Sequence, residues 1–209
     1  MQNSKCKICR REGVKLFLRG EKCLSQKCPI IRKPYPPGPK GKRRIKSLSE
    51  YGKELKEKQR LKNWYNLKER QFKIYVKRVL DARGKVPDAA AALVQILENR
   101  LDNVIFRLGF APSRAAARQI ISHGHVLVNG KHINIPSFSV KKGDKIGVRP
   151  ISAKKKIFQN LAPVLKKYKP PTWLELNAET LEGKVKGVPT LEEAAPPAEI
   201  TSIFEFYSR

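Results

Sequence analysis

The chain has 209 residues, which is enough for one or two domains. It contains 45 Lys and Arg against 18 Asp and Glu, a formal net charge of +27. Solubility needs a charge of magnitude roughly 2–8, so this excess argues against an ordinary enzyme surface and indicates a polyanionic partner. The longest apolar run, Ala89–Val94, is far shorter than a membrane span, and the first residues lack a secretion signal. We therefore expect a cytoplasmic protein with no membrane partner.

Charge is distributed unevenly along the chain. Residues 1–170 carry 42 bases and 11 acids, whereas residues 171–209 carry three bases and seven acids. A basic body with a mildly acidic end predicts one face for nucleic acid and a different face for protein.

All four cysteines lie near the N-terminus, as Cys6-x2-Cys9 and Cys23-x4-Cys28. Two short pairs separated by a loop can place four thiolates at the corners of a tetrahedron around one zinc ion. Four thiolates leave no open coordination position, so we predict one structural zinc ion and no catalytic metal. Two disulfides, an iron–sulfur site and four unrelated free thiols are the alternatives.

Residues 33–46 form a basic linker. Four prolines and two glycines in this segment exclude a helix or a central strand and predict an extended chain. The segment could be a mere spacer, but its density of Lys and Arg favours a course along phosphates.

The middle of the chain is predicted to be helical. Ser47 and Glu50 have the spacing of a capping box, with Ser49 as a competing cap. Two apolar stripes then predict two helices with a break near Asn66. Asp88 is predicted to cap a further helix that faces a core.

Charged residues support these helices. Two Glu-before-Lys pairs at a spacing of four residues, Glu54/Lys58 and Glu69/Lys73, favour helix. The polar faces carry the bases Lys56, Lys58, Arg60, Lys62, Lys68, Arg70, Lys77 and Arg78.

The most informative stretch is 100–149. Apolar periodicity predicts two short helices, the first ended by Gly109 and the second capped by Ser113. Alternating residues then flank Asn129-Gly130, a strong signal for a tight hairpin turn. We expect these helices to pack on a small sheet.

Four arginines lie on these two helices: Arg100, Arg107, Arg114 and Arg118. Their spacing places Arg100 and Arg107 on one face and Arg114 and Arg118 on an exposed face, a rigid guanidinium platform for the phosphates of folded RNA. The free N–H groups at Ser113 add a predicted anion site. Only Asp102 and Asp144 lie inside the stretch to pair with its nine bases, so at most a minority can form internal ion pairs.

Short motifs throughout the chain point to one family. Those in the informative stretch are Arg100-Leu101-Asp102-Asn103, Arg107-Leu108-Gly109, Ser113-Arg114, Ala117-Arg118-Gln119, His123-Gly124-His125 and Val128-Asn129-Gly130. Those outside it include Arg10-Arg11-Glu12-Gly13, Ser49-Glu50-Tyr51-Gly52, Glu69-Arg70-Gln71-Phe72 and Glu205-Phe206-Tyr207-Ser208-Arg209. The first set resembles the RNA-binding module of small-subunit ribosomal protein four. With the second set, the resemblance to the bacterial zinc-containing form of that family runs nearly end to end.

The resemblance implies an α+β fold with two lobes. One lobe is mostly helical with an N-terminal zinc knuckle, and the other is an RNA-binding module of short helices on a small, mainly antiparallel sheet. The implied parts are a zinc knuckle and basic linker at 1–46, a helical lobe at 47–98 completed by about 198–209, the module at 99–149, and an extension with an acidic approach segment at 150–197.

The resemblance also implies a function without catalysis. Members bind the small-subunit ribosomal RNA at a multi-helix junction of its 5′ domain, and they nucleate assembly of the subunit body. They line the path by which mRNA enters, beside ribosomal proteins three and five, and affect decoding accuracy. No small-molecule substrate is implied. The alternatives are an RNA-modifying enzyme with the same module and a zinc-dependent nucleic-acid-binding regulator.

Residue chemistry and resemblance together nominate RNA contacts. In the N-terminal part these are Arg10, Arg11, Lys40, Lys42, Arg43, Arg44 and Lys46, of which the last three are assigned to mRNA. In the helical lobe they are Lys58, Gln59, Lys62, Lys68 and Gln71. In the module and its extension they are Arg100, Arg107, Ser113, Arg114, Arg118, Gln119, His123, His125, Asn129, Lys131, Lys154, Lys155 and Lys156.

Overall fold

The computed structural model describes residues 4–39, 41, 47–82, 87–159 and 161–208, without the side chains of Ser4 and Lys156. The chain divides into two compact units. The helical unit comprises Met1–Leu93 and Ala195–Arg209, and the helix-and-sheet unit comprises Val94–Ala194. No helix in the described residues is both long enough and apolar enough to cross a membrane.

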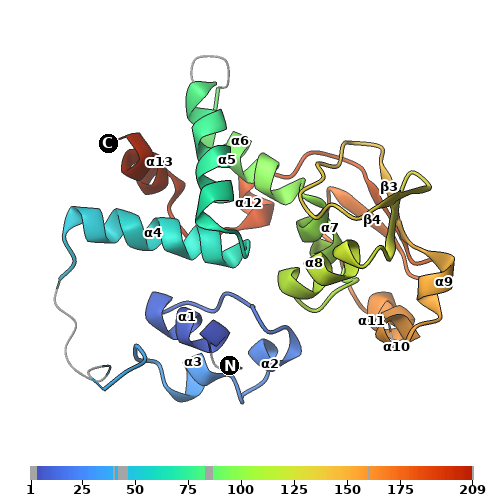
Figure 1. The fold of residues 1–209 in the computed structure, drawn as a ribbon, viewed down its shortest axis with the longest axis horizontal. Coiled ribbons are helices and arrows are strands. Elements are labelled where there is room, and N and C mark those ends of the chain that lie inside the picture. Colours follow the sequence, from blue (N-terminus) through green and yellow to red (C-terminus); the bar gives the residue numbers. More distant parts are fainter. Residues whose placement is uncertain (1–3, 40, 42–46, 83–86, 160, 209) are drawn as a thin grey trace. The chain divides into compact units, whose positions relative to one another are not determined.

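Helices make up the regular structure described in the helical unit (Figure 1). They are α1 (Ser4–Glu12), α2 (Glu21–Leu24), α3 (Pro29–Arg32), α4 (Glu50–Trp64), α5 (Glu69–Asp81) and α13 (Ile200–Ser208), while α6 (Ala89–Glu98) crosses the boundary between the units. The side chain of Ser49 accepts a hydrogen bond from the N–H of Gly52 at 3.3 Å, so Ser49 and not Ser47 caps α4. The predicted break is confirmed at Asn66, whose φ of 55° is left-handed.

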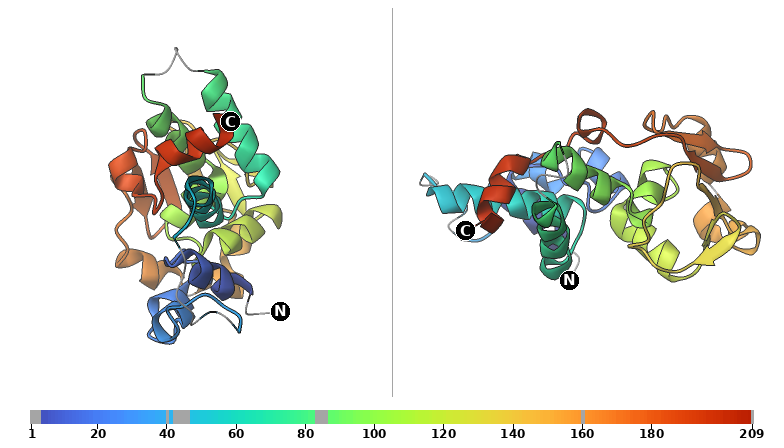
Figure 2. Two further views of the ribbon diagram at one scale, coloured as in Figure 1. Left: turned by 90° about the vertical axis from the view of Figure 1, so that its left-hand side faces the viewer. Right: turned by 90° about the horizontal axis from the view of Figure 1, so that it is seen from above.

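The last helix of the chain belongs to the same unit as α4 and α5. Helix α13 packs against both, and it lies beside them in each view of Figure 1 and Figure 2. Its Ile203 and Phe204 are buried, as are Leu61 of α4 and Phe72 and Val76 of α5. Apolar burial of this kind is the main force that holds such a helix in place.

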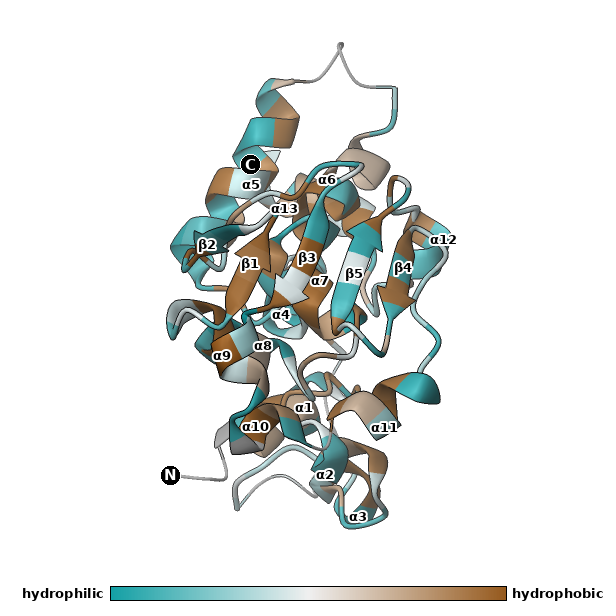
Figure 3. Cartoon of the chain, turned by 90° about the vertical axis from the view of Figure 1, so that its right-hand side faces the viewer, coloured by the Kyte–Doolittle hydropathy of each residue, from teal (hydrophilic) through white to brown (hydrophobic). Residues whose placement is uncertain are grey.

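The helix-and-sheet unit places helices against one antiparallel sheet. Its elements are α7 (Leu101–Arg107), α8 (Arg114–Ser122), β1 (Val126–Val128), β2 (Lys131–Ile133), β3 (Lys145–Val148), α9 (Pro150–Ala153), α10 (Lys156–Gln159), α11 (Leu161–Lys166), β4 (Leu174–Asn177), β5 (Glu182–Val185) and α12 (Leu191–Ala194). The strand order is β2-β1-β3-β5-β4 (Figure 3). Asn129 and Gly130 have φ of 50° and 77°, which confirms the predicted tight turn.

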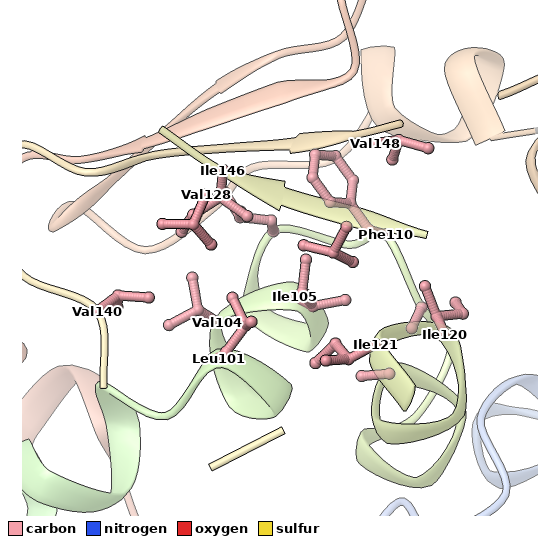
Figure 4. Packing of buried hydrophobic residues seen from close by; sticks show 14 of the residues in the cluster. Leu101, Val104, Ile105, Phe110, Ile120, Ile121, Val128, Val140, Ile146 and Val148 are labelled. Carbon is pink, nitrogen blue, oxygen red and sulfur yellow. The ribbon is translucent and has the colours of Figure 1, made fainter. Parts of the chain in front are cut away.

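The core of this unit lies between the two short helices and the sheet (Figure 4). Ile105 of α7, Ile121 of α8 and Ile146 of β3 are fully buried there. On β5, a Cβ atom added at Gly183 would lie 2.6 Å from the methyl groups of Leu108. Close packing of that leucine therefore requires glycine in the strand.

Candidate nucleic-acid interface

The four cysteines line one small cavity in the N-terminal segment. Cys9, Cys23 and Cys28 are buried and Cys6 is half-buried, and all four are free thiols. The backbone N–H of Arg19 donates to the Sγ of Cys23 at 3.4 Å, and its Nη1 donates to the Sγ of Cys6 at 3.8 Å. The short helices α1, α2 and α3 thus bring together cysteines that are up to 22 positions apart in the sequence.

Burial makes two of these thiols, Cys9 and Cys23, harder to deprotonate. Burial raises the pKa of Cys9 and of Cys23, although backbone hydrogen bonds from Leu16 and Arg19 act in the opposite direction. Among the described residues, no group of three or more His, Cys, Asp or Glu side chains is arranged to hold a metal ion. The structure therefore shows a cluster of thiols and does not itself show a zinc site.

Arg10 is bound within the protein. Its Nε lies 3.0 Å from the carbonyl oxygens of both Lys33 and Tyr35, and its guanidinium carbon lies 4.9 Å from the centre of the Tyr35 ring. Arg11 is exposed. The other RNA contacts predicted for this segment lie outside the described residues: Lys40, Lys42, Arg43, Arg44 and Lys46.

On α4, two predicted RNA contacts bind a carboxylate of the same unit instead. Lys58 is 5% exposed, and its Nζ lies 2.8 Å from Oε1 of Glu69 and 4.3 Å from the centre of the Phe206 ring. The Nζ of Lys62 lies 3.1 Å from the other carboxylate oxygen of Glu69. The hydroxyl of Tyr207 donates to Glu69 at 2.8 Å, so this cluster links α4, α5 and α13.

The electrostatics of Glu69 follow from these contacts. Burial by itself raises the pKa of this carboxyl, but hydrogen bonds from Lys58, Tyr207 and Lys62 outweigh it and lower the pKa to about 2. The same hydrogen bond, added to burial, raises the pKa of Tyr207. Of the other contacts predicted here, Gln71 donates to the Tyr75 hydroxyl at 3.1 Å. Gln59 is half-buried and Lys68 is exposed.

In the helix-and-sheet unit, Asp102 binds two of the predicted arginines. Arg100 is 3% exposed and donates from Nε and Nη2 to the two oxygens of Asp102 at 3.0 and 2.7 Å. Arg118 donates from Nη2 to the same carboxylate at 2.7 Å, with 31% of its side chain exposed. Two guanidinium groups therefore share one buried acid, and only Arg118 also reaches solvent.

Glu98 organises the other two arginines. Its carboxylate accepts hydrogen bonds from Nε and Nη2 of Arg107 at 3.0 and 2.9 Å, and from the Asn103 amide at 2.7 Å. The amide oxygen of Asn103 accepts in turn from Nε of Arg114 at 2.7 Å. Arg114 also lies over the Phe106 ring, 4.6 Å from its centre.

The predicted arginine platform is corrected by these contacts. Three of the four platform arginines, Arg100, Arg107 and Arg118, form ion pairs, so internal pairing takes most of the platform and not a minority of it. Arg114 is buried, so its predicted exposed face is wrong. Sequence reasoning missed Glu98 because it lies just before the stretch, nine positions from Arg107. Its place at the end of an apolar helix was the available signal, since a carboxylate buried there needs a partner.

Several other predicted contacts on this unit make internal bonds. The Ser113 hydroxyl accepts from the N–H of Ala116 at 3.3 Å and confirms the predicted cap, although Ser113 is only 6% exposed. Asn129 donates to Asp144 at 2.8 Å and accepts from the Lys145 N–H at 2.9 Å. The side chains of Ser113 and Asn129 thus form hydrogen bonds within the unit that fix the start of α8 and the hairpin turn.

His125 is also internal. It is 7% exposed, with Nδ1 3.0 Å from the Ser152 hydroxyl. Burial, followed by the nearby charges of Lys155, His123 and Arg149, lowers the pKa of His125. The exposed candidates of this unit are Gln119, His123, Asn129, Lys131, Lys154 and Lys155, and the Lys156 side chain lies outside the described part.

Comparison with known proteins covers both parts of the chain. Residues 1–98 match the family described as Ribosomal protein S4/S9 N-terminal domain, and residues 99–146 match the S4 domain family. The chain is 48% identical over 205 residues to small ribosomal subunit protein uS4 of Halothermothrix orenii, covering 98% of this chain and 96% of that protein. The protein of the same description from Dictyoglomus turgidum is 47% identical over 209 residues, with the same coverage. That from Natranaerobius thermophilus is 44% identical over 208 residues, covering 100% of this chain and 98% of that protein.

These relatives are structural components of the ribosome and not enzymes, which excludes the alternative of an RNA-modifying enzyme. The S4 domain match contains the Asp102 network, the Arg107 partner of Glu98 and the hairpin, the part of the chain that the motifs assign to RNA. The chain therefore belongs to the ribosomal protein S4 family, the RNA-binding structural proteins of the small ribosomal subunit.

Proposed function

We propose that this protein is a primary binder of the small-subunit ribosomal RNA, which holds the multi-helix junction of the 5′ domain in one geometry and so nucleates assembly of the subunit body. The observation that carries the proposal is the rigid arginine network of the helix-and-sheet unit. Glu98 and Asp102 fix four guanidinium groups by hydrogen bonds of 2.7–3.2 Å, directly or through Asn103. Arg118 is the member of this network with the most exposed side chain, and a side chain that is already held in place loses little conformational entropy when it binds a folded RNA.

The binding energy in this proposal comes mainly from charge. Phosphate contacts by Lys and Arg release counterions, and they position a protein on RNA without reading its bases. Arg118, with its exposed edge, and the nearby Gln119 and His123 lie on or at the end of α8, where they can meet phosphates and 2′-hydroxyls. By fixing the junction, the protein would lower the free-energy cost for later proteins to bind, which is coupling through RNA shape.

Salt-dependent binding to the 5′ domain of small-subunit ribosomal RNA tests this function, with an unrelated structured RNA of equal length as competitor. We expect tight binding that survives the competitor. The double variant Gln119→Glu and His123→Glu should weaken it, whereas Glu179→Gln and Glu205→Gln, at exposed acidic positions, should not. Equal binding of both RNAs by the unmodified protein would show that only the net charge of +27 is measured, and would contradict the proposal.

We further propose that the four cysteines hold one structural zinc ion. The chemistry of the donor set supports this proposal, because four cysteine sulfurs line one cavity and Arg19 donates two hydrogen bonds to them, which would stabilise thiolate ligands. Zinc would neutralise the thiolates and join α1, α2 and α3. Because the pKa values of Cys9 and Cys23 are raised, binding must release protons and weaken as the pH falls.

Metal analysis of the intact purified protein tests the zinc proposal. We expect one zinc per chain, and faster amide exchange over residues 4–39 once a chelator removes it. Cys9→Ser should lose zinc, whereas Ser25→Ala, in the same segment, should retain it. Metal-free protein with unchanged exchange in this segment would contradict the proposal.

We also propose contacts beyond ribosomal RNA. Arg43, Arg44 and Lys46 are assigned to mRNA on the path by which it enters the subunit, a proposal supported by their charge and by the family resemblance. Neighbouring ribosomal proteins three and five, and an effect on decoding accuracy, are proposed on the resemblance and on the acidic character of residues 171–209. Crosslinking from Arg43 and from residues 171–209 in an assembled subunit would test the mRNA and the protein contacts. Crosslinks to ribosomal RNA alone would argue against both proposals.

A further inference from the structure

The turn between β1 and β2 contains the one Asn-Gly pair of the sequence, Asn129-Gly130. Both residues have left-handed φ values, 50° and 77°, which a tight two-residue hairpin turn of this kind requires. The same pair is chemically reactive, because glycine has no side chain to keep its backbone nitrogen away from the side-chain carbon of the asparagine. The two residues that suit this turn are therefore also a site at which spontaneous modification can occur.

The reaction open to this pair is deamidation. The backbone nitrogen of Gly130 loses its proton and bonds to Cγ of Asn129, while the bond from Cγ to Nδ2 breaks and ammonia leaves. Water then opens the resulting cyclic imide at one of its two C–N bonds. One opening gives aspartate at position 129, and the other gives isoaspartate, in which the main chain runs through the side-chain carboxyl carbon. Water is the only co-reactant, and nothing is oxidised or reduced.

The turn is open to this reaction on its outer side. Asn129 and Gly130 are both exposed. A Cβ atom placed on Gly130 would meet no heavy atom of the described residues within 4 Å. Water therefore reaches the turn, and neighbouring side chains do not shield it. Any protection must come from the way in which the asparagine side chain is held.

That side chain is held at the start of β3, the strand next to β1 (Figure 3). Its Nδ2 donates to Oδ1 of Asp144 at 2.8 Å, and its Oδ1 accepts from the N–H of Lys145 at 2.9 Å. Asp144 is fixed in turn, because its other carboxylate oxygen accepts from the N–H of Lys141 at 2.7 Å. The two bonds to the asparagine amide therefore set the plane of that amide.

The bond to Asp144 opposes deamidation. The Gly130 nitrogen must approach Cγ from above the amide plane, and Nδ2 must leave as ammonia, so the hydrogen bond from Nδ2 has to break. An ionised acceptor makes this bond stronger than one between neutral groups. The N–H of Lys145 acts the other way, since it can stabilise negative charge that develops on Oδ1. Protection therefore depends on the Asp144 carboxylate.

We propose that Asn129-Gly130 is a deamidation site that the folded helix-and-sheet unit suppresses through Asp144, so that chains which stay unfolded are permanently marked at this position. The inference is independent of the proposed RNA-binding and zinc-binding functions.

The products of the reaction cannot restore the pairing that suppressed it. Aspartate at position 129 has no Nδ2–H to donate, and its negative charge faces the Asp144 carboxylate. Isoaspartate adds one carbon to the main chain between Val128 and Lys131, which are paired across the turn. A marked chain therefore forms a weaker hairpin, and the helix-and-sheet unit that contains it is less stable.

Mass spectrometry of the full-length protein after incubation in mildly alkaline buffer tests the proposal. Trypsin cleaves after Lys131, which places Asn129 and Asn134 in different peptides. Asn134 is also exposed but is followed by isoleucine, whose branched side chain hinders the attack, so it is a slow internal standard. We expect position 129 to lose its amide at least about tenfold more slowly in folded protein than in urea-unfolded protein, the effect of one hydrogen bond to a charged group.

Two variants identify the protecting residue. Asp144→Ala should raise the rate in folded protein about tenfold, because it removes the acceptor of the Nδ2 bond. Glu179→Ala removes an exposed carboxylate from the same unit and should leave the rate unchanged. The fluorescence of buried Trp173 shows whether each variant is folded.

A second measurement does not depend on Asp144→Ala being folded. Asn129→Asp imitates one product and should lower the urea midpoint of the unit. The exchange of Asn129→Asp with Asp144→Asn keeps a hydrogen bond between the two side chains, with donor and acceptor reversed, and should restore the midpoint.

Three results would overturn the proposal. Equal deamidation in folded and urea-unfolded protein would show that the fold gives no protection. Equal rates in folded Asp144→Ala and Glu179→Ala would show that Asp144 is not the protecting residue. An unchanged urea midpoint in Asn129→Asp would show that the mark has no effect on stability.

Discussion

Removing the Glu98 carboxylate should destabilise the helix-and-sheet unit more than any surface ion pair does. Glu98 is fully buried, and its carboxylate accepts hydrogen bonds from Nε and Nη2 of Arg107 and from the amide of Asn103. In Glu98→Ala the guanidinium and the amide lose these bonds where water has little access, because the Arg107 side chain is only 17% exposed.

The magnitude follows from that burial. Removing one partner of a buried ion pair costs about 3–5 kcal/mol, because the other charge is left uncompensated. Partial exposure of Arg107 favours the lower end, so we expect about 3 kcal/mol for Glu98→Ala. Glu98→Gln keeps an acceptor and a similar shape, so it should cost about 2 kcal/mol. Either value is a large share of the roughly 5–15 kcal/mol that stabilises a typical domain.

Tryptophan fluorescence can report on this unit alone. The two tryptophans lie in different units, so a Trp64→Phe background leaves Trp173, which is 3% exposed, as the reporter for urea unfolding. The matched control is Glu175→Gln, since the Lys186–Glu175 pair in the same unit is 3.2 Å long and over half exposed. Exposed pairs contribute about 0–1 kcal/mol. A cost below about 1 kcal/mol for Glu98→Ala, or one equal to the control, would refute the reasoning.

Three further predictions concern stability and local order. The pKa of Glu69 is lowered to about 2 from its usual 4.5, so its stabilisation is complete above pH 4.5 and lost as the pH falls toward 2. The Glu69 side chain is 45% exposed, so Tyr207→Phe should remove only about 1 kcal/mol of that acid-sensitive stability. Urea unfolding at pH 7 and pH 3 measures this loss, and an equal loss at both pH values would contradict the prediction. Gly183→Ala should lower the free energy of unfolding by about 1–3 kcal/mol, because its Cβ would overlap a core leucine; an unchanged urea midpoint would contradict that packing. Arg10→Gln should speed proteolysis near residues 33–36, and Arg11→Gln should not; equal rates would mean that the side-chain bonds of Arg10 do not hold this segment.

Features set by local chemistry could be predicted from the sequence. Ser113 caps α8, and the side chain of Asp88 accepts from the N–H groups of Ala90 and Ala91 at 2.8 and 3.2 Å, as expected for a cap. Gly109 ends a helix with a φ of 81°, a conformation that glycine adopts without strain. In each case the determining contact lies within four residues, so the local pattern contains the information.

Features set by long-range pairing could not be predicted. Glu69 contacts Lys58 on another helix and Tyr207, which is 138 residues further along the chain. Nothing in the local pattern distinguishes these partners from Lys73, four residues away. The choice depends on α13 packing against α4 and α5, a tertiary contact that brings the tyrosine to the carboxylate. Sequence reasoning therefore identified a basic helical region but assigned RNA contacts to its paired residues.

The internal pairing changes how loss of RNA binding must be interpreted in this protein. Arg100 and Arg114 match family motifs and are buried, so a variant such as Arg100→Ala would leave Asp102 with one partner fewer and disturb the position of Arg118. RNA affinity would fall even if Arg100 touched no nucleotide. A measurement of RNA affinity alone therefore cannot distinguish an arginine that contacts RNA from one that only holds its neighbours in position. The salt slope can, because a displaced surface loses affinity at every salt concentration, whereas a lost phosphate contact also reduces the number of ions released. By this criterion Arg100→Ala should lower RNA affinity together with stability and leave the salt slope unchanged.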